Sequence, residues 1–263
     1  MKPARILMIA GSDSGGGAGI QADIKTVTVL GGHAMTAITA VTAQNTLGVQ
    51  AVHAIPAEMV IAQMDSVISD IGVDAVKIGM IGSAETAEAV AEYLTRLSVP
   101  IVFDPVMIAT SGAVLADART ISVFQRLMAL ASVVTPNIPE MEALGGAAGI
   151  LRHGCILLAK GGHGQGDEIV DQLIGPSGTL REYRAARIDT AHTHGTGCTL
   201  ASALACRLGQ GYPIGEAFDD AVRFVRAAIR SAPGLGQGHG PLGQQNIRNF
   251  GNEITGMTDD HRR

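Results

Sequence analysis

The chain lacks tryptophan and has few other aromatic residues, so its core must consist mainly of aliphatic side chains. Its three cysteines, Cys155, Cys198 and Cys206, include no CxxC pair, which argues against a disulfide framework and favours a reducing compartment. No His/Cys cluster has zinc-site spacing. No apolar run approaches the roughly 18 residues that a membrane-spanning helix needs, and Ile6–Ala10 is too short for a secretory signal. These absences predict a cytoplasmic protein with no membrane partner.

Basic residues are not clustered either. The formal net charge of −5 and the lack of a basic stripe predict no nucleic-acid partner. Hydrophobic residues make up 46% of the 263 positions, which is enough for one large core, so we expect residues 1–263 to form a single domain. Because the apolar residues are mostly Ala, Val, Ile and Leu, we expect a parallel sheet covered by helices on both faces.

Short apolar runs alternate with Ala-rich segments of helical periodicity. The predicted strands are Ile6–Ala10, Ala34–Val41, Ala75–Ile78, Ile101–Asp104, Val133–Thr135, Cys155–Lys160, Asp167–Ile174 and Thr179–Ala185. The predicted helices are Ile20–Leu30, Ala57–Asp70, Ala84–Leu97, Ala118–Leu130, Thr196–Leu208 and Ile214–Ser231. The tail from Pro233 is expected to wrap or fray. This alternation predicts an α/β fold with parallel pairing, in which ligands bind at the carboxyl ends of the strands.

The strongest local signal is the segment Thr193–Thr199, where Gly195, Thr196 and Gly197 precede an apolar helix. A glycine turn of this kind presents free N–H groups at a helix N-terminus, which together with the helix dipole bind an anion such as phosphate. Cys198 would lie in the first helical turn, where a thiolate is favoured and its pKa is lowered. A glycine turn with a buried, inert cysteine is an equally good interpretation of the same residues.

A second glycine-rich segment, Gly11–Gly19, follows the first predicted strand. Its spacing matches neither a Walker A loop nor a dinucleotide-binding fingerprint. Its backbone amides and the carboxylates of Asp13 and Asp23 could hold a polar ligand. The alternative is a flexible surface loop, which is a weak one because the segment runs directly into a predicted helix.

Polar side chains follow several other strands at the same predicted edge. Asp104 could hold magnesium or orient a phosphate, and Asn137 and Glu140 would share one helix face nearby. Taken singly, these three residues are more often helix or turn caps. Lys160 could pair with a triphosphate, and the Gln44 amide could pair with the edge of a heterocycle. An exposed lysine and a loop amide are the plain alternatives.

Together, and in this order, these segments resemble the hydroxymethylpyrimidine and phosphomethylpyrimidine kinase family of the ribokinase-like superfamily. The resemblance runs from Ile6 to about Leu242. It rests on the stretches GSDSGGGAGIQADIKT, VTAQNTLGV, DAVKIGMIGS, FDPVMIATSGAVL, VTPNIPEMEAL, AKGGHG and THGTGCTLASA. It implies a three-layer α/β/α sandwich around a mostly parallel sheet, usually as a homodimer. It also implies two ATP-dependent phosphorylations, first of the alcohol of 4-amino-5-hydroxymethyl-2-methylpyrimidine and then of its monophosphate, in thiamin synthesis.

The resemblance also implies roles for individual residues. The pyrimidine pocket would be formed by Gly11, Asp23, Gln44, Met80, Val106 and Met107. Cys198 would act as the general base, with Gly195, Thr196 and Gly197 as the anion hole. ATP would contact Lys160, Asn137, Glu140 and Thr196, and Mg²⁺ would contact Asp104 and Glu140. The chain departs from the family pattern in a shorter segment between Leu144 and Cys155, and in its end around Gly240–Gln244.

Three other functions remain open. The first is a pyridoxal kinase of the same fold. The second is a cysteine hydrolase that uses Cys198 with His192 or His194, which requires a histidine beside the thiol in space. The third is a non-catalytic pyrimidine-binding protein, for which the shortened segment after Leu144 is the only support.

Overall fold

The computed structural model describes residues 2–109, 112–161, 166–248 and 250. One nine-stranded sheet crosses the protein in the order β3-β2-β1-β4-β5-β6-β7-β8-β9. Its strands are β1 Arg5–Asp13, β2 His33–Asn45, β3 Gly48–Ala54, β4 Ala75–Ile78, β5 Ile101–Phe103, β6 Val133–Val134, β7 Ile156–Ala159, β8 Glu168–Gly175 and β9 Gly178–Ala186. The strands from β2 through β1, β4, β5 and β6 to β7 pair in parallel, and β3, β8 and β9 add antiparallel edges.

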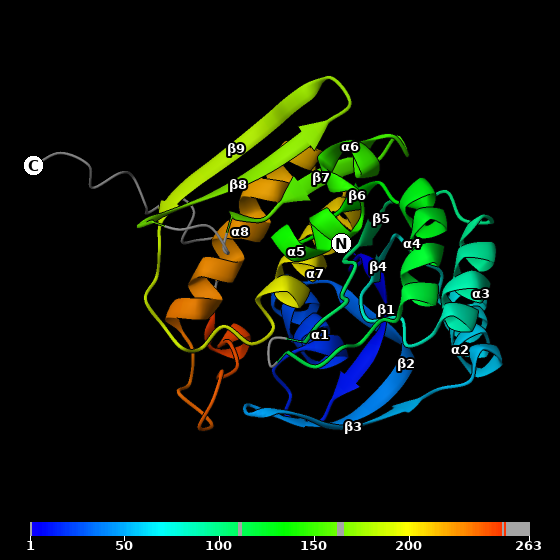
Figure 1. The fold of residues 1–263 in the computed structure, drawn as a ribbon, viewed down its shortest axis with the longest axis horizontal. Coiled ribbons are helices and arrows are strands. Elements are labelled where there is room, and N and C mark those ends of the chain that lie inside the picture. Colours follow the sequence, from blue (N-terminus) through cyan, green and yellow to red (C-terminus); the bar gives the residue numbers. More distant parts are fainter. Residues whose placement is uncertain (1, 110–111, 162–165, 249, 251–263) are drawn as a thin grey trace, which may run out of the picture.

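Helices cover both faces of this sheet (Figure 1). They are α1 Gly19–Val29, α2 Ala57–Asp70, α3 Ala84–Leu94, α4 Ala118–Leu130, α5 Ile138–Ala143, α6 Gly146–Leu151, α7 Thr196–Gly209 and α8 Ile214–Arg230, with a short 3₁₀ turn η2 at Gln244–Asn246. The α/β class, the three layers and the mostly parallel sheet expected from the sequence are confirmed.

The alternation of side chains along the strands divides the core in two. Leu7 and Ile9 of β1 pack in the cluster that contains α2, α3 and α4, whereas Ile6 and Met8 pack in the cluster with α1, α7 and α8. Successive residues of a strand point to opposite faces, so β1 contributes side chains to both clusters. Ala75 of β4 lies in the second cluster, which places the next residue of the same parity, Lys77, on the face covered by α1 and α7.

Several boundaries differ from the prediction. β1 continues to Asp13 and β2 to Asn45, because β2 continues pairing with β1 as far as Asp13 and Thr42 and is extended by antiparallel pairing with β3. β3 was not predicted, since most of its residues are exposed and give no apolar run. The first part of the glycine-rich segment is therefore a strand, and the loop proper begins after Asp13.

The C-terminal segment is more closely packed than a fraying tail. Leu242 is fully buried, and the Gln244 side chain donates a 2.9 Å hydrogen bond to the Thr199 hydroxyl inside the α7 face. The backbone of Pro241 also bridges to His194, just before α7. Of the two expected outcomes, wrapping is the correct one for this part of the tail, which contacts α7 and the residue before it.

The shortened segment after Leu144 is filled by α6, whose Ile150 is fully buried. Gly145 and Gly146 make the tight connection from α5, with φ of 88° and 72°. The short helix α6 therefore packs against β7, within the sheet. None of the described helices is long and apolar enough to cross a membrane.

Candidate active site

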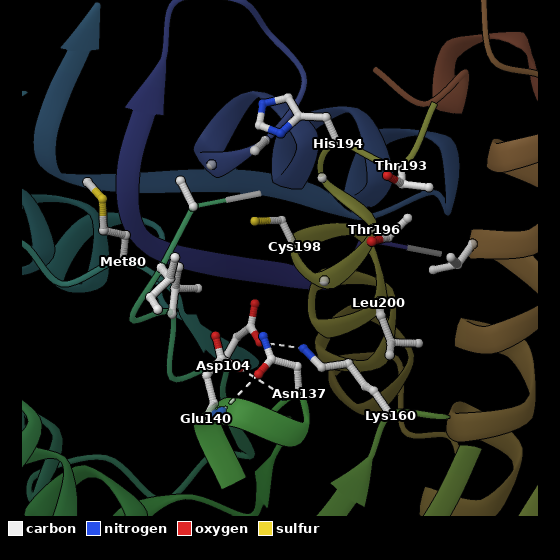
Figure 2. A pocket seen from close by; sticks show the side chains of 18 of the residues that line it. Met80, Asp104, Asn137, Glu140, Lys160, Thr193, His194, Thr196, Cys198 and Leu200 are labelled. Atoms are coloured by element: carbon white, nitrogen blue, oxygen red, sulfur yellow. Dashed lines mark hydrogen bonds and ion pairs between the residues drawn. The ribbon is translucent and has the colours of Figure 1, made fainter. Parts of the chain in front are cut away.

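A cavity of about 860 Å³ opens at the carboxyl ends of the central strands. It is lined by almost every candidate residue of the sequence, namely Gly11, Gln44, Met80, Asp104, Val106, Met107, Asn137, Glu140, Lys160, Gly195, Thr196, Gly197 and Cys198. In Figure 2, Asp104, Asn137, Glu140 and Lys160 gather at one end, Met80 and His194 lie toward the other, and Cys198 lies between them in this view. The prediction of a crevice at this edge is confirmed.

The start of α7 forms one wall of the cavity. Gly195 is its N-cap, with a left-handed φ of 90°, and a Cβ there would lie 1.9 Å from the carbonyl oxygen of Gly17. Only glycine fits both the conformation and the space. The 14-residue helix therefore begins with its free amides facing the cavity, where they and the helix dipole favour a negative charge.

Asp104 and Lys160 lie directly opposite this helix end. Lys160 Nζ donates to Asp104 Oδ1 over 3.1 Å, and the Thr135 hydroxyl donates to the same oxygen over 3.0 Å. A Cβ built on Gly197 would lie 3.4 Å from Lys160 Nζ and 3.5 Å from Asp104 Oδ2. Burial opposes the charge on Lys160, but Asp104 and Glu140 outweigh it and raise its pKa. A cation, a carboxylate and helix amides thus meet within a few ångströms.

Asn137 and Glu140 form a capping box at the start of α5. Asn137 Oδ1 accepts from the Glu140 backbone N–H over 2.9 Å, and Glu140 Oε2 accepts from the Asn137 N–H over 2.8 Å. The capping alternative raised from the sequence is thus correct, and it coexists with a place in the cavity wall. Burial raises the pKa of Glu140 to about 7; Lys160 opposes this shift and Asp104 adds to it.

Asp13 organises the glycine loop rather than presenting a free carboxylate. Its oxygens accept from the backbone amides of Gly15, Gly17 and Ala18 and contact His194 Nε2 at 2.9 Å. Burial opposes the charged form, but these contacts, His194 first, outweigh it and lower the pKa of Asp13. We expected the Asp13 carboxylate to hold a polar ligand. In the structure it instead joins the loop before α1 to the loop before α7.

The same contact bears on the cysteine-hydrolase alternative. His194 is engaged by Asp13, so it is not available as a base for Cys198. His192 lies against Gly234 and Gly240 of the C-terminal segment. Neither histidine has the thiol contact that a Cys–His pair needs.

Among the residues assigned to the pyrimidine pocket, Asp23 is the one that does not line the cavity. It is fully buried on α1, and its two oxygens accept from Lys77 Nζ over 3.0 Å and 2.9 Å. The Ser202 hydroxyl donates to it over 2.6 Å. The prediction that Asp23 contacts the pyrimidine directly is therefore corrected, because Lys77 stands between Asp23 and the cavity.

Cys198 lies in the first turn of α7 as predicted, but its electrostatics differ from the prediction. Burial raises the pKa of its thiol to about 11, and the charges of Asp23 and Asp104 add to this. Lys77 acts in the opposite direction but does not outweigh them. The expectation of a lowered pKa is wrong, because desolvation exceeds the effect of the helix end.

The opposite end of the cavity has a mixed lining. Met80, Val106 and Met107 are apolar, and Met107 is 5% exposed. A Cβ on Gly11 would lie 2.2 Å from Met80 Cε, so the missing side chain makes room for the methionine. Gln44 contributes an amide that also hydrogen-bonds Asp13. This end suits a flat heterocycle with polar edges.

Sequence reasoning missed Lys77 and Thr135, considered His194 only as a partner of Cys198, and gave no role to Asp171. Asp171 lines the cavity and accepts from the Gly161 N–H over 2.8 Å. The signal for Lys77 was present, because a lysine inside the short buried strand Ala75–Ile78 needs a buried partner. The glycines after Gly161 in the predicted AKGGHG motif lie outside the described residues.

The donor set can be tested against a magnesium ion. Within the described parts of the chain, no group of three or more His, Cys, Asp or Glu residues could hold a metal. Mg²⁺ in phosphate-transfer sites is usually held by one or two carboxylates together with substrate oxygens. Asp104, whose Oδ2 faces Gly197, and the neighbouring Glu140 meet that requirement.

The fold is of the ribokinase-like class, which this chain shares with its solved structural neighbours. The family model described as phosphomethylpyrimidine kinase matches residues 13–243. The chain belongs to that family.

Two curated relatives show the extent of the similarity. The hydroxymethylpyrimidine/phosphomethylpyrimidine kinase of Rhizobium meliloti is 47% identical over 253 residues, covering 90% of this chain and 95% of that protein. The thiamine biosynthesis bifunctional protein ThiED of Geobacter sulfurreducens is 48% identical over 255 residues, covering 90% of this chain. The match takes in 51% of that longer relative, so this chain spans about half its length.

Among solved structures, an ADP complex of Bacillus subtilis pyridoxal kinase aligns with a TM-score of 0.84 and 32% sequence identity. The alignment covers 93% of this chain and 98% of that one. A phosphomethylpyrimidine kinase from Clostridium difficile also aligns, with a TM-score of 0.72 and 38% identity over 86% of this chain and 99% of that one, so a pyridoxal kinase and a pyrimidine kinase share this architecture.

We predict that Glu140 makes stability depend on pH. Its pKa rises from 4.5 to about 7 on folding, so the native state binds more protons between these values. Stability should therefore fall as pH rises through this window, by roughly 1–3 kcal/mol, since one pKa unit corresponds to about 1.4 kcal/mol. Glu140→Gln, which keeps the capping box, should flatten this decline in denaturant unfolding measured from pH 5 to 8.

The exposed Glu142 of the same helix supplies a matched control. Glu142→Gln should reproduce the wild-type profile. Equal slopes for wild type and Glu140→Gln would show that burial of Glu140 has no such effect.

Proposed function

We propose that this protein is an ATP-dependent kinase that phosphorylates 4-amino-5-hydroxymethyl-2-methylpyrimidine and then its monophosphate, in thiamin synthesis. Membership of the family and the activities after which its relatives are named support this assignment. A solved neighbour in complex with ADP supports a nucleotide as the phosphoryl donor.

The observation that carries the proposal is the position of Gly197. A Cβ built on Gly197 would lie 3.4 Å from Lys160 Nζ and 3.5 Å from Asp104 Oδ2. Cys198 and the start of α7 line the same part of the cavity. Phosphoryl transfer depends on positioning and on stabilising the charge on the transferred group. The amides of Gly195 and Gly197 are assigned to receive that charge, whereas the Thr196 amide donates to the Thr193 carbonyl over 3.3 Å and would have to exchange that partner.

The nucleotide end is assigned to Lys160, Asn137, Glu140 and Thr196. Lys160 donates to one carboxylate oxygen of Asp104, which leaves its other N–H donors for phosphate oxygens. Asp104 and Glu140 are the residues that would hold Mg²⁺, which supplies charge neutralisation on the phosphates when it is bound.

The acceptor end is assigned to Gly11, Gln44, Met80, Val106 and Met107. The Gln44 amide offers both donors and an acceptor to a pyrimidine edge, and the two methionines supply adaptable apolar contacts. Asp23 is given no ligand contact in this proposal, because it lies outside the cavity lining and Lys77 holds both of its oxygens.

In the first step, the substrate oxygen bonds to the γ-phosphorus while the bond to the β–γ bridging oxygen breaks. ADP leaves, and the hydroxyl proton must pass to a base, for which we assign Cys198. In the second step the acceptor is a phosphate monoester, which is already ionised near neutral pH and needs no base. The raised thiol pKa leaves only a small thiolate fraction near pH 8, so the first step is the one limited by Cys198.

The main competing function is a pyridoxal kinase, and the TM-score of 0.84 to such an enzyme is the observation that favours it. Turnover of hydroxymethylpyrimidine, its monophosphate and pyridoxal with Mg·ATP separates the two. We expect both pyrimidines to be better substrates than pyridoxal by kcat/KM. A large preference for pyridoxal would reverse the assignment, and pyrimidine binding without ATP consumption would make the protein a non-catalytic binder.

Replacement of Cys198 should separate the two steps. Cys198→Ala should slow phosphorylation of the alcohol by about 10²-fold or more, the usual contribution of a general base, and leave phosphorylation of the monophosphate within a few-fold. In the wild type, the rate of the first step should rise with pH between 7 and 9, while the second stays nearly flat.

Single-turnover assays of each step measure these rates. Cys155→Ala, at a buried cysteine away from the cavity lining, is the control for loss of a thiol. Equal losses in both steps on Cys198→Ala would count against a base role.

We also propose a cytoplasmic homodimer. The free cysteines suit a reducing compartment. Three apolar side chains on β2, β3 and the turn between them are exposed, and a second copy of the chain could cover them. They are Val41, Leu47 and Val52, with 47%, 63% and 50% exposure.

Light scattering tests the homodimer. The wild type should be a dimer, and Val52→Lys should weaken it. A wild-type monomer at micromolar concentration would remove the dimer from the proposal.

A further inference from the structure

One buried charge cluster next to the cavity has no part in the mechanism given so far. It consists of Lys77, Asp23 and Ser202, from β4, α1 and α7. Among the ion pairs in the described part of the chain, Lys77–Asp23 is the one in which both side chains are 0% exposed. Burying two opposite charges rarely stabilises a fold more than apolar packing of the same volume. The presence of this buried ion pair beside the cavity therefore indicates a functional role rather than a stabilising one.

The local structure is built to hold the Lys77 ammonium in one place. Lys77 lies on the α1 and α7 face of β4, in line with Ala75. Two residues later, a Cβ on Gly79 would lie 2.7 Å from Lys77 Nζ and 3.2 Å from the Ala10 methyl group. Glycine at this position leaves the space that the ammonium occupies. Lys77 also lines the cavity, which Asp23 does not.

Groups from each surrounding element act on this charge. Asp23 of α1, Cys198 of α7 and Asp104 after β5 all favour charged Lys77 and outweigh its burial, so its pKa is raised. In return, Lys77 is the largest of the influences that favour ionised Cys198, whereas Asp23 and Asp104 disfavour it. The Ser202 hydroxyl is neutral and fixes Asp23. Ser202 lies four residues after Cys198, so both side chains are on the same face of α7, and Lys77 and Cys198 both line the cavity. Lys77 is thus a charged neighbour of the thiol.

We propose that Lys77 is a positioning residue for the first phosphorylation: its fixed ammonium supplies the positive charge that lets Cys198 take the proton of the acceptor hydroxyl. This inference rests on the proposed function for the identity of that hydroxyl. The proton moves from the substrate oxygen to the Cys198 sulfur as the oxygen–phosphorus bond forms. Lys77 keeps its own protons throughout and acts only through its charge.

The test measures the ionisation of Cys198 without substrate. Alkylation of Cys198 by iodoacetamide, followed by mass spectrometry of its peptide from pH 7 to 11, reports the thiolate fraction. Lys77→Met should shift this profile upward by a unit or more, which slows alkylation at pH 9 by about tenfold. The same variant should lower kcat of the first phosphorylation, move its pH profile upward and leave KM for ATP within about twofold.

Arg207→Met is the matched structural control. It breaks another buried ion pair on α7, with Asp220, outside the cavity lining. It should lower the melting temperature and leave the Cys198 profile in place. If a substitution acted only by loosening the fold, water would reach the Cys198 thiol and its alkylation profile would move to lower pH. That direction is opposite to the shift expected for Lys77→Met.

If Lys77→Met does not fold, Lys77→Met/Asp23→Asn removes both charges and keeps a hydrogen bond acceptor for Ser202. Its Cys198 profile should still lie above that of the wild type, because Lys77 acts on the thiol more strongly than Asp23 does. An unchanged or lowered profile in the folded variant overturns the inference. An upward shift in a protein that phosphorylates no pyrimidine would keep the role of Lys77 and reject the proposed substrate.

Discussion

The arrangement of the site depends on one backbone constraint, the fit of Gly195 against Gly17. The N-cap of α7 has a φ of 90° and leaves no room for a Cβ, which would meet the Gly17 carbonyl at 1.9 Å. The Asp13–His194 contact, between residues 181 apart in sequence, locks the same two loops together. The helix amides are thereby aimed at Asp104 and Lys160 before any ligand arrives, as electrostatic stabilisation of a transition state requires.

The sequence was sufficient for the parts of the structure that follow from local pattern. Alternating strands and helices gave the layered α/β class, and the rule that parallel sheets bind ligands at their carboxyl edge brought Asp104, Asn137, Glu140 and Lys160 together. Boundaries were less accurate where tertiary pairing decides them. β3 has mostly exposed residues and exists because it pairs with an extended β2, which no local periodicity reveals.

Electrostatics could not be predicted from local sequence. Placing Cys198 at a helix N-terminus predicted a lowered pKa, but the desolvation that raises it to about 11 comes from the packing of distant segments. Asp23 likewise looked like a ligand contact beside the glycine loop. Its partner Lys77 is 54 residues away in sequence, and only the folded chain shows that the lysine stands in front of the carboxylate.

Lys160 and Lys77, the two lysines that line the cavity, differ in how their ammonium groups are held. Lys160 shares a single oxygen of Asp104, which the Thr135 hydroxyl also contacts, so a triphosphate can compete for its donors. Lys77 is held by both oxygens of Asp23 with no exposed surface, so exchanging that partner would leave a buried carboxylate unpaired. The first cation is therefore suited to a ligand that comes and goes. The second is suited to a constant field beside Cys198, where the proposed first step needs a proton to leave.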